Sequence, residues 1–143
     1  MDRYDVLKLE NQLCFPLYAC SREMIKEYKP FLDRLELTYT QYITMLVLWE
    51  KKSINVKALG DILYLDSGTL TPLLKKLEIK GLVSRKRSSE DERNLIISIT
   101  EDGEALKELA VSIPGDVSKC SNLTCEEHQA MYQILYKFLN RNR

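Results

Sequence analysis

Hydrophobic residues in this 143-residue chain recur mainly at the three- and four-residue spacing of an α-helix. This spacing predicts a mostly helical segment over residues 7–34 and, after a capping-box pattern that starts at Thr38, a core helix over 39–50. Pro16 interrupts the first segment, because proline lacks a backbone N–H and crowds the carbonyl group four residues before it. We therefore expect either a kink at Pro16 or a new helix that begins near Phe15.

Two shorter helical patterns follow between residues 55 and 81. Asn55 or a neighbour can cap the first helix. Asp66 or Ser67 can cap the second, and Gly81 ends it. Two short helices joined by a tight turn are typical of a helix-turn-helix, whose second helix enters the major groove of DNA.

The pattern then changes to the alternation of β-strands. LVSRKR (82–87) and NLIISIT (94–100) predict two strands, and the polar segment SSEDER between them predicts a turn. A hairpin that directly follows a helix-turn-helix is a wing. The sequence therefore predicts a mainly α fold with a small β-hairpin, the winged helix-turn-helix, over about residues 36–100.

Helical segments flank this unit on both sides. Thr100 can cap a helix that Pro114-Gly115 interrupts, and residues 123–139 predict a last helix. We treat 1–143 as one domain, in which segments 1–35 and 101–143 carry apolar residues with little to bury against inside a winged helix. A homodimer built from these terminal helices buries their apolar residues between the two chains. It also presents two recognition helices to a pseudo-palindromic double-stranded DNA site.

Charge is balanced over the whole chain but not along it. The chain has 21 basic and 21 acidic residues, whereas residues 75–93 hold seven basic and four acidic ones, a net charge of +3. A locally basic face on an otherwise acidic body favours nucleic acid as the partner. The sequence has neither an apolar run of membrane-spanning length nor a signal peptide, so we expect no membrane and a cytoplasmic location.

The four cysteines, Cys14, Cys20, Cys120 and Cys125, do not have zinc-site spacing, and the chain has one histidine. We therefore expect no metal, and neither a phosphate-binding glycine loop nor a nucleophile elbow suggests a cofactor or an enzyme. Cys20 is expected to pack in the core. From the residues alone, Cys14 is also interpreted as a small buried hydrophobic residue.

Several motifs together resemble the MarR family of winged-helix regulators. They are LENQLCFPLYA, LTYTQYITMLVLWE, LYLDSGTLTPLLKKLE, GLV, DERN and ISITEDG. NQLCF indicates the branch that senses organic hydroperoxides, OhrR, and SarZ-like staphylococcal relatives look similar. Pro16 departs from the family pattern.

The resemblance implies a homodimeric repressor that an organic hydroperoxide releases from its operator DNA. The position that matches the family's sensing cysteine is Cys14, which is oxidised to a sulfenic acid and then to a disulfide or mixed disulfide. Tyr28 and Tyr39 match tyrosines that hydrogen-bond this cysteine, and Tyr18 matches a third nearby. A thiolate is the nucleophile towards peroxide, and phenol hydroxyls can stabilise it without adding charge.

Two routes for the oxidised cysteine stay open. In a two-cysteine route a second cysteine of the other subunit resolves the sulfenate, and Cys120 is favoured over Cys125. In a one-cysteine route a low-molecular-weight thiol does so.

DNA contacts are expected from the first turns of the recognition helix and from the wing. By resemblance, Arg93 is the wing arginine that enters the minor groove, and Asp91 is the acid that positions it. The full expected set is Ser67, Thr69, Thr71, Lys75, Lys76, Arg85, Arg87, Asp91 and Arg93.

Other functions are compatible with parts of the sequence. Within the same fold, the chain could respond to a small phenolic or aromatic ligand, or could be a broader redox-responsive regulator of virulence or biofilm formation. A thiol peroxidase-type enzyme would not need LDSGTLTPLLKKLE or the wing. A winged helix that binds only a protein partner would not need the local net charge of +3.

Overall fold

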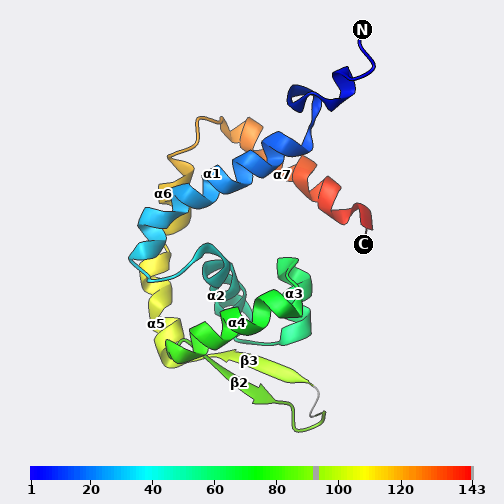
Figure 1. Cartoon of the computed structure of the whole chain (residues 1–143). Helices are drawn as coiled ribbons and strands as arrows, with labels where there is room; N and C mark the ends of the chain where they lie inside the picture. Colours follow the sequence, from blue (N-terminus) through cyan, green and yellow to red (C-terminus); the bar gives the residue numbers. More distant parts are fainter. Residues whose placement is uncertain (92–93, 143) are drawn as a thin grey trace. The chain divides into compact units, whose positions relative to one another are not determined.

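The computed structural model describes residues 1–91 and 94–142, for Asn142 the backbone alone (Figure 1). Residues Met1–Ile113 form one compact unit and Pro114–Arg143 a second. The first unit contains two 3-10 turns, Asp5–Leu7 and Leu9–Asn11, and then α1 (Cys14–Asp33), α2 (Tyr39–Lys51), β1 (Ser53–Asn55), α3 (Val56–Leu63), α4 (Ser67–Ile79), β2 (Val83–Arg87), β3 (Leu95–Ile99) and α5 (Glu101–Ala110). Helix α6 (Ile113–Ser118) starts at the end of this unit, and α7 (Cys125–Leu139) with a 3-10 turn, Asn140–Asn142, belongs to the second.

Helix α2 forms the centre of the core, as its apolar sequence predicted. The capping box is confirmed: Thr38 Oγ1 accepts a hydrogen bond from the Gln41 N–H at 3.3 Å, and Gln41 Oε1 accepts one from the Thr38 N–H at 3.0 Å. The buried side chains of α2 lie against apolar residues of the helix-turn-helix and the sheet. Large side chains in this core that are almost fully buried are Met45, Leu48, Leu59, Leu70, Leu74, Leu77 and Ile97.

The helix-turn-helix consists of α3 and α4, and both predicted caps are confirmed. Asn55 Oδ1 accepts from the Lys57 N–H at 2.7 Å, and Asp66 Oδ1 accepts from the Thr69 N–H at 2.8 Å. The turn between the helices requires a glycine on its inner side. A Cβ on Gly60 would lie only 2.7 Å from the carbonyl oxygen of Leu65.

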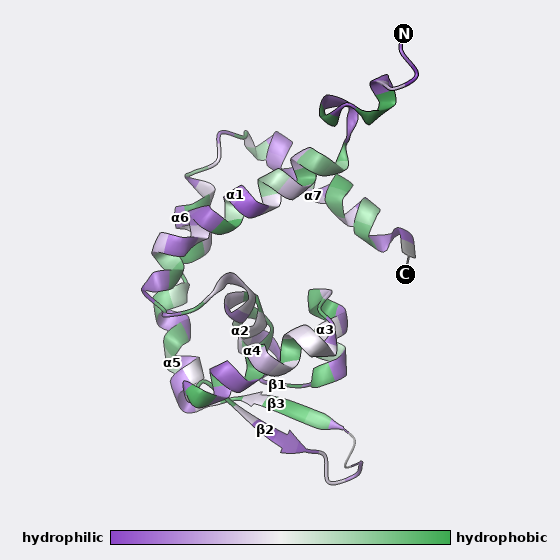
Figure 2. Cartoon of the chain, viewed as in Figure 1, coloured by the Kyte–Doolittle hydropathy of each residue, from purple (hydrophilic) through white to green (hydrophobic). Residues whose placement is uncertain are grey.

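The wing is the predicted antiparallel hairpin of β2 and β3, with Arg85 opposite Ile97. A third strand, β1, was not predicted. It pairs with the other edge of β3, which gives the order β1-β3-β2. Three residues are too few to show an alternating pattern. Figure 2 colours β2 as hydrophilic and β3 as hydrophobic, in keeping with an edge strand beside a central one.

Near the prolines, one helix boundary agrees with the predictions and the other differs. Helix α1 begins at Cys14, beside the predicted start near Phe15, and Pro16 is its third residue. Pro114 and Gly115 lie inside α6, so the expected interruption falls between Ala110 and Ile113 instead. Proline fits at the start of a helix because the first N–H groups have no partner within the helix.

The terminal helices bury few side chains. Leu32 alone is buried among the fully described residues of α1, and none is buried in α7, which is described throughout. Among the residues described, no helix is long and apolar enough to span a bilayer.

Candidate redox site and DNA interface

Cys14 is the first residue of α1 and is exposed. The backbone N–H groups of a helix's first turn form the positive end of its dipole, which favours a negative group there. Pro16 removes an N–H that would have had no partner inside the helix, so the proline starts α1 at the cysteine rather than interrupting it. Residues on both sides of Cys14 in the sequence line a shallow hollow: Lys8, Leu9, Glu10, Gln12, Phe15 and Pro16.

Two of the three expected tyrosines, Tyr28 and Tyr39, lie together. Their ring centroids are 5.1 Å apart in an edge-to-face arrangement, and Tyr42, which was not predicted from the sequence, lies 5.8 Å from Tyr28. Burial raises the pKa of Tyr28 and of Tyr39, and it raises the pKa of Tyr42 to about 12. All three phenols therefore stay protonated near neutral pH and can act as hydrogen-bond donors. Tyr42 could have been found from its three-residue spacing after Tyr39.

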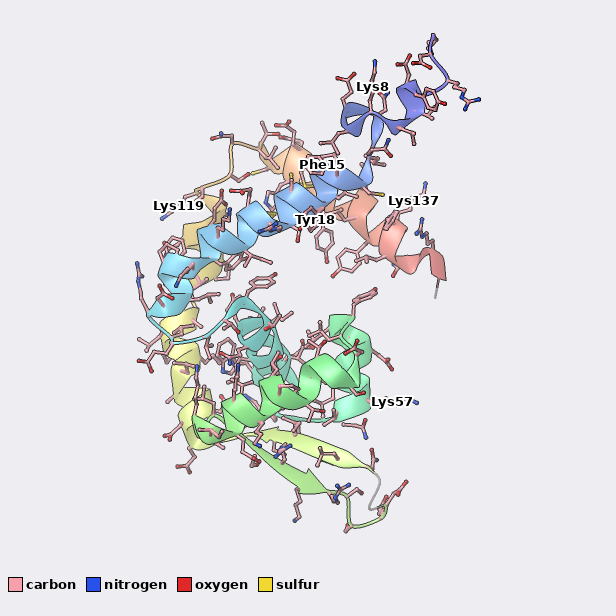
Figure 3. All side chains as sticks on the ribbon, in the orientation of Figure 1. Lys8, Phe15, Tyr18, Lys57, Lys119 and Lys137 are labelled. Carbon is pink, nitrogen blue, oxygen red and sulfur yellow. The ribbon has the colours of Figure 1, made fainter. Side chains whose placement is uncertain are left out.

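One chain does not bring Cys14 to this tyrosine pair. Cys14 and Tyr28 lie fourteen residues apart on the same helix, which is about 21 Å of helical rise. Tyr18 is exposed, and its hydroxyl accepts a hydrogen bond from Arg22 Nη1 at 3.0 Å. Figure 3 shows Phe15 and Tyr18 on the first half of α1. Within a single chain, therefore, neither Tyr28 nor Tyr39 can hydrogen-bond the sensing position.

The other cysteines are all exposed. The expectation that Cys20 packs in the core was wrong, because only the far end of α1 is buried, at Leu32. Cys120 lies after α6, with its Sγ 3.7 Å from the carbonyl oxygen of Asp116. Cys125 is the first residue of α7, where Thr124 and Glu127 form a capping box.

The recognition helix α4 separates its apolar and polar residues cleanly. Leu70, Leu73, Leu74 and Leu77 are buried. The expected DNA-binding residues of this helix are all exposed: Ser67, Thr69, Thr71, Lys75 and Lys76. The helix thus presents hydroxyl and ammonium groups to a partner, the side-chain types that contact phosphates and base edges.

The expected wing residues have different surroundings. Arg85 is half-buried and binds Glu78 of α4 through two hydrogen bonds, from Nε at 3.2 Å and from Nη2 at 3.1 Å. These hydrogen bonds to Arg85 lower the pKa of Glu78 below its usual value. Arg87 and Asp91 are exposed, whereas Arg93 lies outside the described residues.

A groove joins the helix-turn-helix to the wing. It is lined by Asn55, Val56, Lys57, Gly60, Asp61, Leu65, Asp66, Ser67, Leu70, Asn94 and Leu95. Lys57, which projects from the start of α3 (Figure 3), was not among the expected contacts. Its position in the sequence could have suggested it as a candidate contact, because the first helix of a helix-turn-helix crosses the DNA backbone. Among the described parts of the chain, no cluster of His, Cys, Asp and Glu is suited to a metal ion.

A helix-turn-helix with a polar recognition helix, followed directly by a two-stranded wing, defines a winged-helix transcriptional regulator. The family described as transcriptional regulator SarA/Rot matches residues 26–109. The chain is 55% identical over 138 residues to the organic hydroperoxide resistance transcriptional regulator of Bacillus subtilis, covering 96% of this chain and 94% of that protein. It is 45% identical over 134 residues to the HTH-type transcriptional regulator SarZ of Staphylococcus epidermidis, covering 94% and 90%.

Solved structures of AbfR are also similar. Reduced AbfR bound to DNA has a TM-score of 0.77 at 36% identity, covering 96% of both chains. Overoxidized AbfR bound to DNA has a TM-score of 0.78 at 34% identity, covering 99% of this chain and 100% of that one. Disulfide-formed AbfR has a TM-score of 0.63 at 36% identity, covering 96% and 93%. The chain belongs to the MarR family of transcriptional regulators, in its organic-hydroperoxide-sensing OhrR branch.

Proposed function

We propose that this chain is a homodimeric repressor that binds operator DNA while Cys14 is reduced and releases it when an organic hydroperoxide oxidises Cys14. The observation that carries the proposal is the exposed Cys14 at the first turn of a long helix, in a chain whose α4 and wing form a DNA-reading unit. The relatives support it, since one is a regulator of organic hydroperoxide resistance.

In the proposed dimer, the tyrosines that hydrogen-bond Cys14 come from the second subunit. Because about 21 Å of α1 separates Cys14 from Tyr28, the tyrosine pair near Cys14 belongs to the other subunit. Two α1 helices that pack antiparallel bring each cysteine to the partner's tyrosines. Exposed apolar side chains on α1 and at its N-cap support such packing: Leu13, Phe15, Leu17, Met24 and Ile25.

The first chemical step is an oxygen transfer. The Cys14 thiolate attacks the outer oxygen of the hydroperoxide, a sulfur–oxygen bond forms and the oxygen–oxygen bond breaks. The alkoxide leaves and takes a proton to become an alcohol, so the peroxide is reduced and the sulfur is oxidised to a sulfenic acid. Protonated Tyr28 and Tyr39 donate hydrogen bonds to the thiolate before this step.

A second thiol then condenses with the sulfenic acid, forming a disulfide and water. We propose Cys120 of the partner subunit as this thiol, with Cys125 as the second candidate and a low-molecular-weight thiol as the alternative. The AbfR structures favour a disulfide as the releasing state. AbfR has been solved bound to DNA in an overoxidized form, so in that relative an oxidised form is compatible with DNA binding, and a disulfide form has been solved as well.

A disulfide between subunits releases DNA because it changes the distance between the two recognition helices. It pulls the terminal helices together and so changes the separation of the two recognition helices. Half-sites on one face of DNA lie about 34–36 Å apart, so a small change in separation prevents the two helices from reading both half-sites together.

The test combines DNA binding with the covalent state of the protein. The DNA is a labelled duplex that the wild-type protein selects from a randomised library, and binding is measured before and after one equivalent of cumene hydroperoxide. Non-reducing gels and intact mass are recorded for the wild type, Cys14→Ser, Cys120→Ser, Cys125→Ser and the control Cys20→Ser. We expect Cys14→Ser to bind the duplex and to stay bound after peroxide, and Cys20→Ser to behave as the wild type.

The gel and the mass separate the two routes. A band of dimer mass that needs both Cys14 and Cys120 supports the two-cysteine route. A monomer that gains oxygen or an added small thiol at Cys14 supports the one-cysteine route. If Cys14→Ser still releases DNA on oxidation, Cys14 is not the sensor, and the ligand-responsive repressor becomes the better hypothesis.

A further inference from the structure

Glu78 and Arg85 connect the recognition helix to the wing. Glu78 is the twelfth of thirteen residues in α4, and Arg85 is the middle residue of β2. Arg85 donates through Nε and Nη2 to the two carboxylate oxygens, at 3.2 and 3.1 Å. This paired arrangement fixes the direction of the guanidinium plane as well as its distance, which a single ammonium group cannot do.

Strand β2 pairs with β3 along its whole length, from Val83 to Arg87, and further hydrogen bonds lie at the near end of the strand. The Leu82 N–H donates to the carbonyl of Leu77 at 3.1 Å, and Thr100 Oγ1 donates to the carbonyl of Gly81 at 2.6 Å. Beyond these bonds β2 runs outward to Arg87. The Glu78–Arg85 pair lies further along the strand and joins β2 directly to α4.

We propose that the Glu78–Arg85 pair is a brace that holds the wing at its DNA-reading angle to the recognition helix. Arg85 is then a positioning residue, and not the phosphate contact that its place in the basic segment suggested. The inference rests on the proposed DNA-binding function. It adds a residue, Glu78, whose negative charge would otherwise count only against DNA binding.

The charge of Glu78 makes the proposal testable, because two models predict opposite changes in DNA affinity when this charge is removed. If Arg85 binds phosphate directly, Glu78→Gln removes a repulsive charge and frees the guanidinium, so affinity rises. If the pair is a brace, the same substitution lowers affinity although the protein becomes more positive. Glu90→Gln is the matched control, since exposed Glu90 lies in the wing loop and its replacement removes the same charge without breaking the pair.

The experiment measures binding to the duplex selected by the wild type over a series of salt concentrations, for Glu78→Gln, Arg85→Gln, Arg85→Lys, the double Gln variant and Glu90→Gln. We expect about three- to tenfold weaker binding for each variant of the pair. Arg85→Lys weakens binding despite keeping its charge, since lysine cannot form the paired hydrogen bonds. The double variant is no weaker than the weaker single variant, because the brace can be broken only once. The salt slope stays that of the wild type, and Glu90→Gln binds at least as tightly as the wild type, because it removes a negative charge and leaves the pair intact.

Other outcomes overturn the brace. Tighter binding by Glu78→Gln, or wild-type binding by Arg85→Lys, assigns Arg85 to direct phosphate binding. So does a salt slope in Arg85→Gln that falls by about 0.9 for each phosphate that is no longer neutralised. Circular dichroism and thermal unfolding show whether each variant is folded, and Arg85→Lys and Glu90→Gln are the mildest changes. Failure of the wild type to select any duplex overturns the proposed function itself, a result distinct from any change among variants.

Discussion

Tyr28 of α1 and Tyr39 of α2 meet edge to face, with ring centroids 5.1 Å apart and planes inclined at 62°. Tyr42 lies against both rings and also 6.4 Å from Trp49. Trp49 Nε1 in turn donates a hydrogen bond to the carbonyl of Gly103 at 2.8 Å. The two tyrosines that we propose for the redox site therefore pack in an aromatic cluster that reaches the start of α5. Packing against the core therefore fixes the orientation of these two side chains.

Removing either hydroxyl of this pair should slow the oxidation of Cys14. A hydrogen bond to a charged group contributes roughly 1.5–3 kcal/mol, so we expect Tyr28→Phe and Tyr39→Phe to react with cumene hydroperoxide about ten- to a hundredfold more slowly. The rate is followed as loss of free thiol in the Cys20→Ser background. Tyr42→Phe is the control, because its ring packing is kept and no sensing role is assigned to its hydroxyl. Unchanged rates in both Phe variants would remove Tyr28 and Tyr39 from the redox site.

The same cluster predicts a loss of stability at high pH. Burial, followed by the neighbouring Tyr28 and Tyr39, raises the pKa of Tyr42 from its usual 10.0 to about 12. Since the folded-state pKa lies above the unfolded value, this stabilisation is complete below pH 10 and is lost as the pH rises through about 12. The expected loss is on the order of 2 kcal/mol. Urea unfolding across this pH range should show it, and the curve for Tyr42→Phe should be flatter; equal slopes for the two proteins would contradict the assignment.

Gly103 is predicted to be intolerant of even one methyl group. A Cβ there would lie 2.3 Å from the carbonyl oxygen of Leu82 and 2.7 Å from Cγ1 of Ile99. Because the first of these is backbone, Gly103→Ala must shift the base of the wing, at a cost of about 1–3 kcal/mol. Gly115→Ala is the matched control, since a Cβ at this helical position meets nothing within 4 Å. It should be neutral or stabilising by up to about 1 kcal/mol. Thermal unfolding compares the two, and similar midpoints would refute the close approach.

The parts of the fold that depend on neighbouring residues could be predicted from the sequence. Caps form within one turn of the chain, so Thr38, Asn55, Asp66 and Thr100 all mark helix starts that the structure confirms. The winged helix-turn-helix follows from the order of these helices and the alternating strands. Cys14 at the start of α1 also followed from a local rule, the tolerance of proline in a helix's first turn.

The parts that depend on distant residues could not be predicted. Strand β1 exists because Ile54 pairs with Ile97 across the sheet, and three residues carry no periodic signal. The pairing of Arg85 with an acidic residue was not predicted, because the two residues lie on different elements. Only the fold places Glu78 beside it. Cys20 was expected in the core, yet one chain leaves most of α1 exposed.

Lys76 on the exposed face of α4 should contribute to DNA affinity through charge alone. A lysine that neutralises one phosphate releases condensed counterions, so Lys76→Met should lower the slope of log affinity against log salt by about 0.9 for each phosphate left without its lysine. Affinity should fall by a similar factor for the selected duplex and for a scrambled one, because phosphate contacts carry no sequence information. Lys107→Met is the control, since this exposed lysine lies in the last turn of α5 and belongs neither to the recognition helix nor to the wing. Fluorescence anisotropy over a range of salt concentrations measures both quantities. Weaker binding confined to the selected duplex would instead assign Lys76 to base recognition, and an unchanged slope would remove it from the interface.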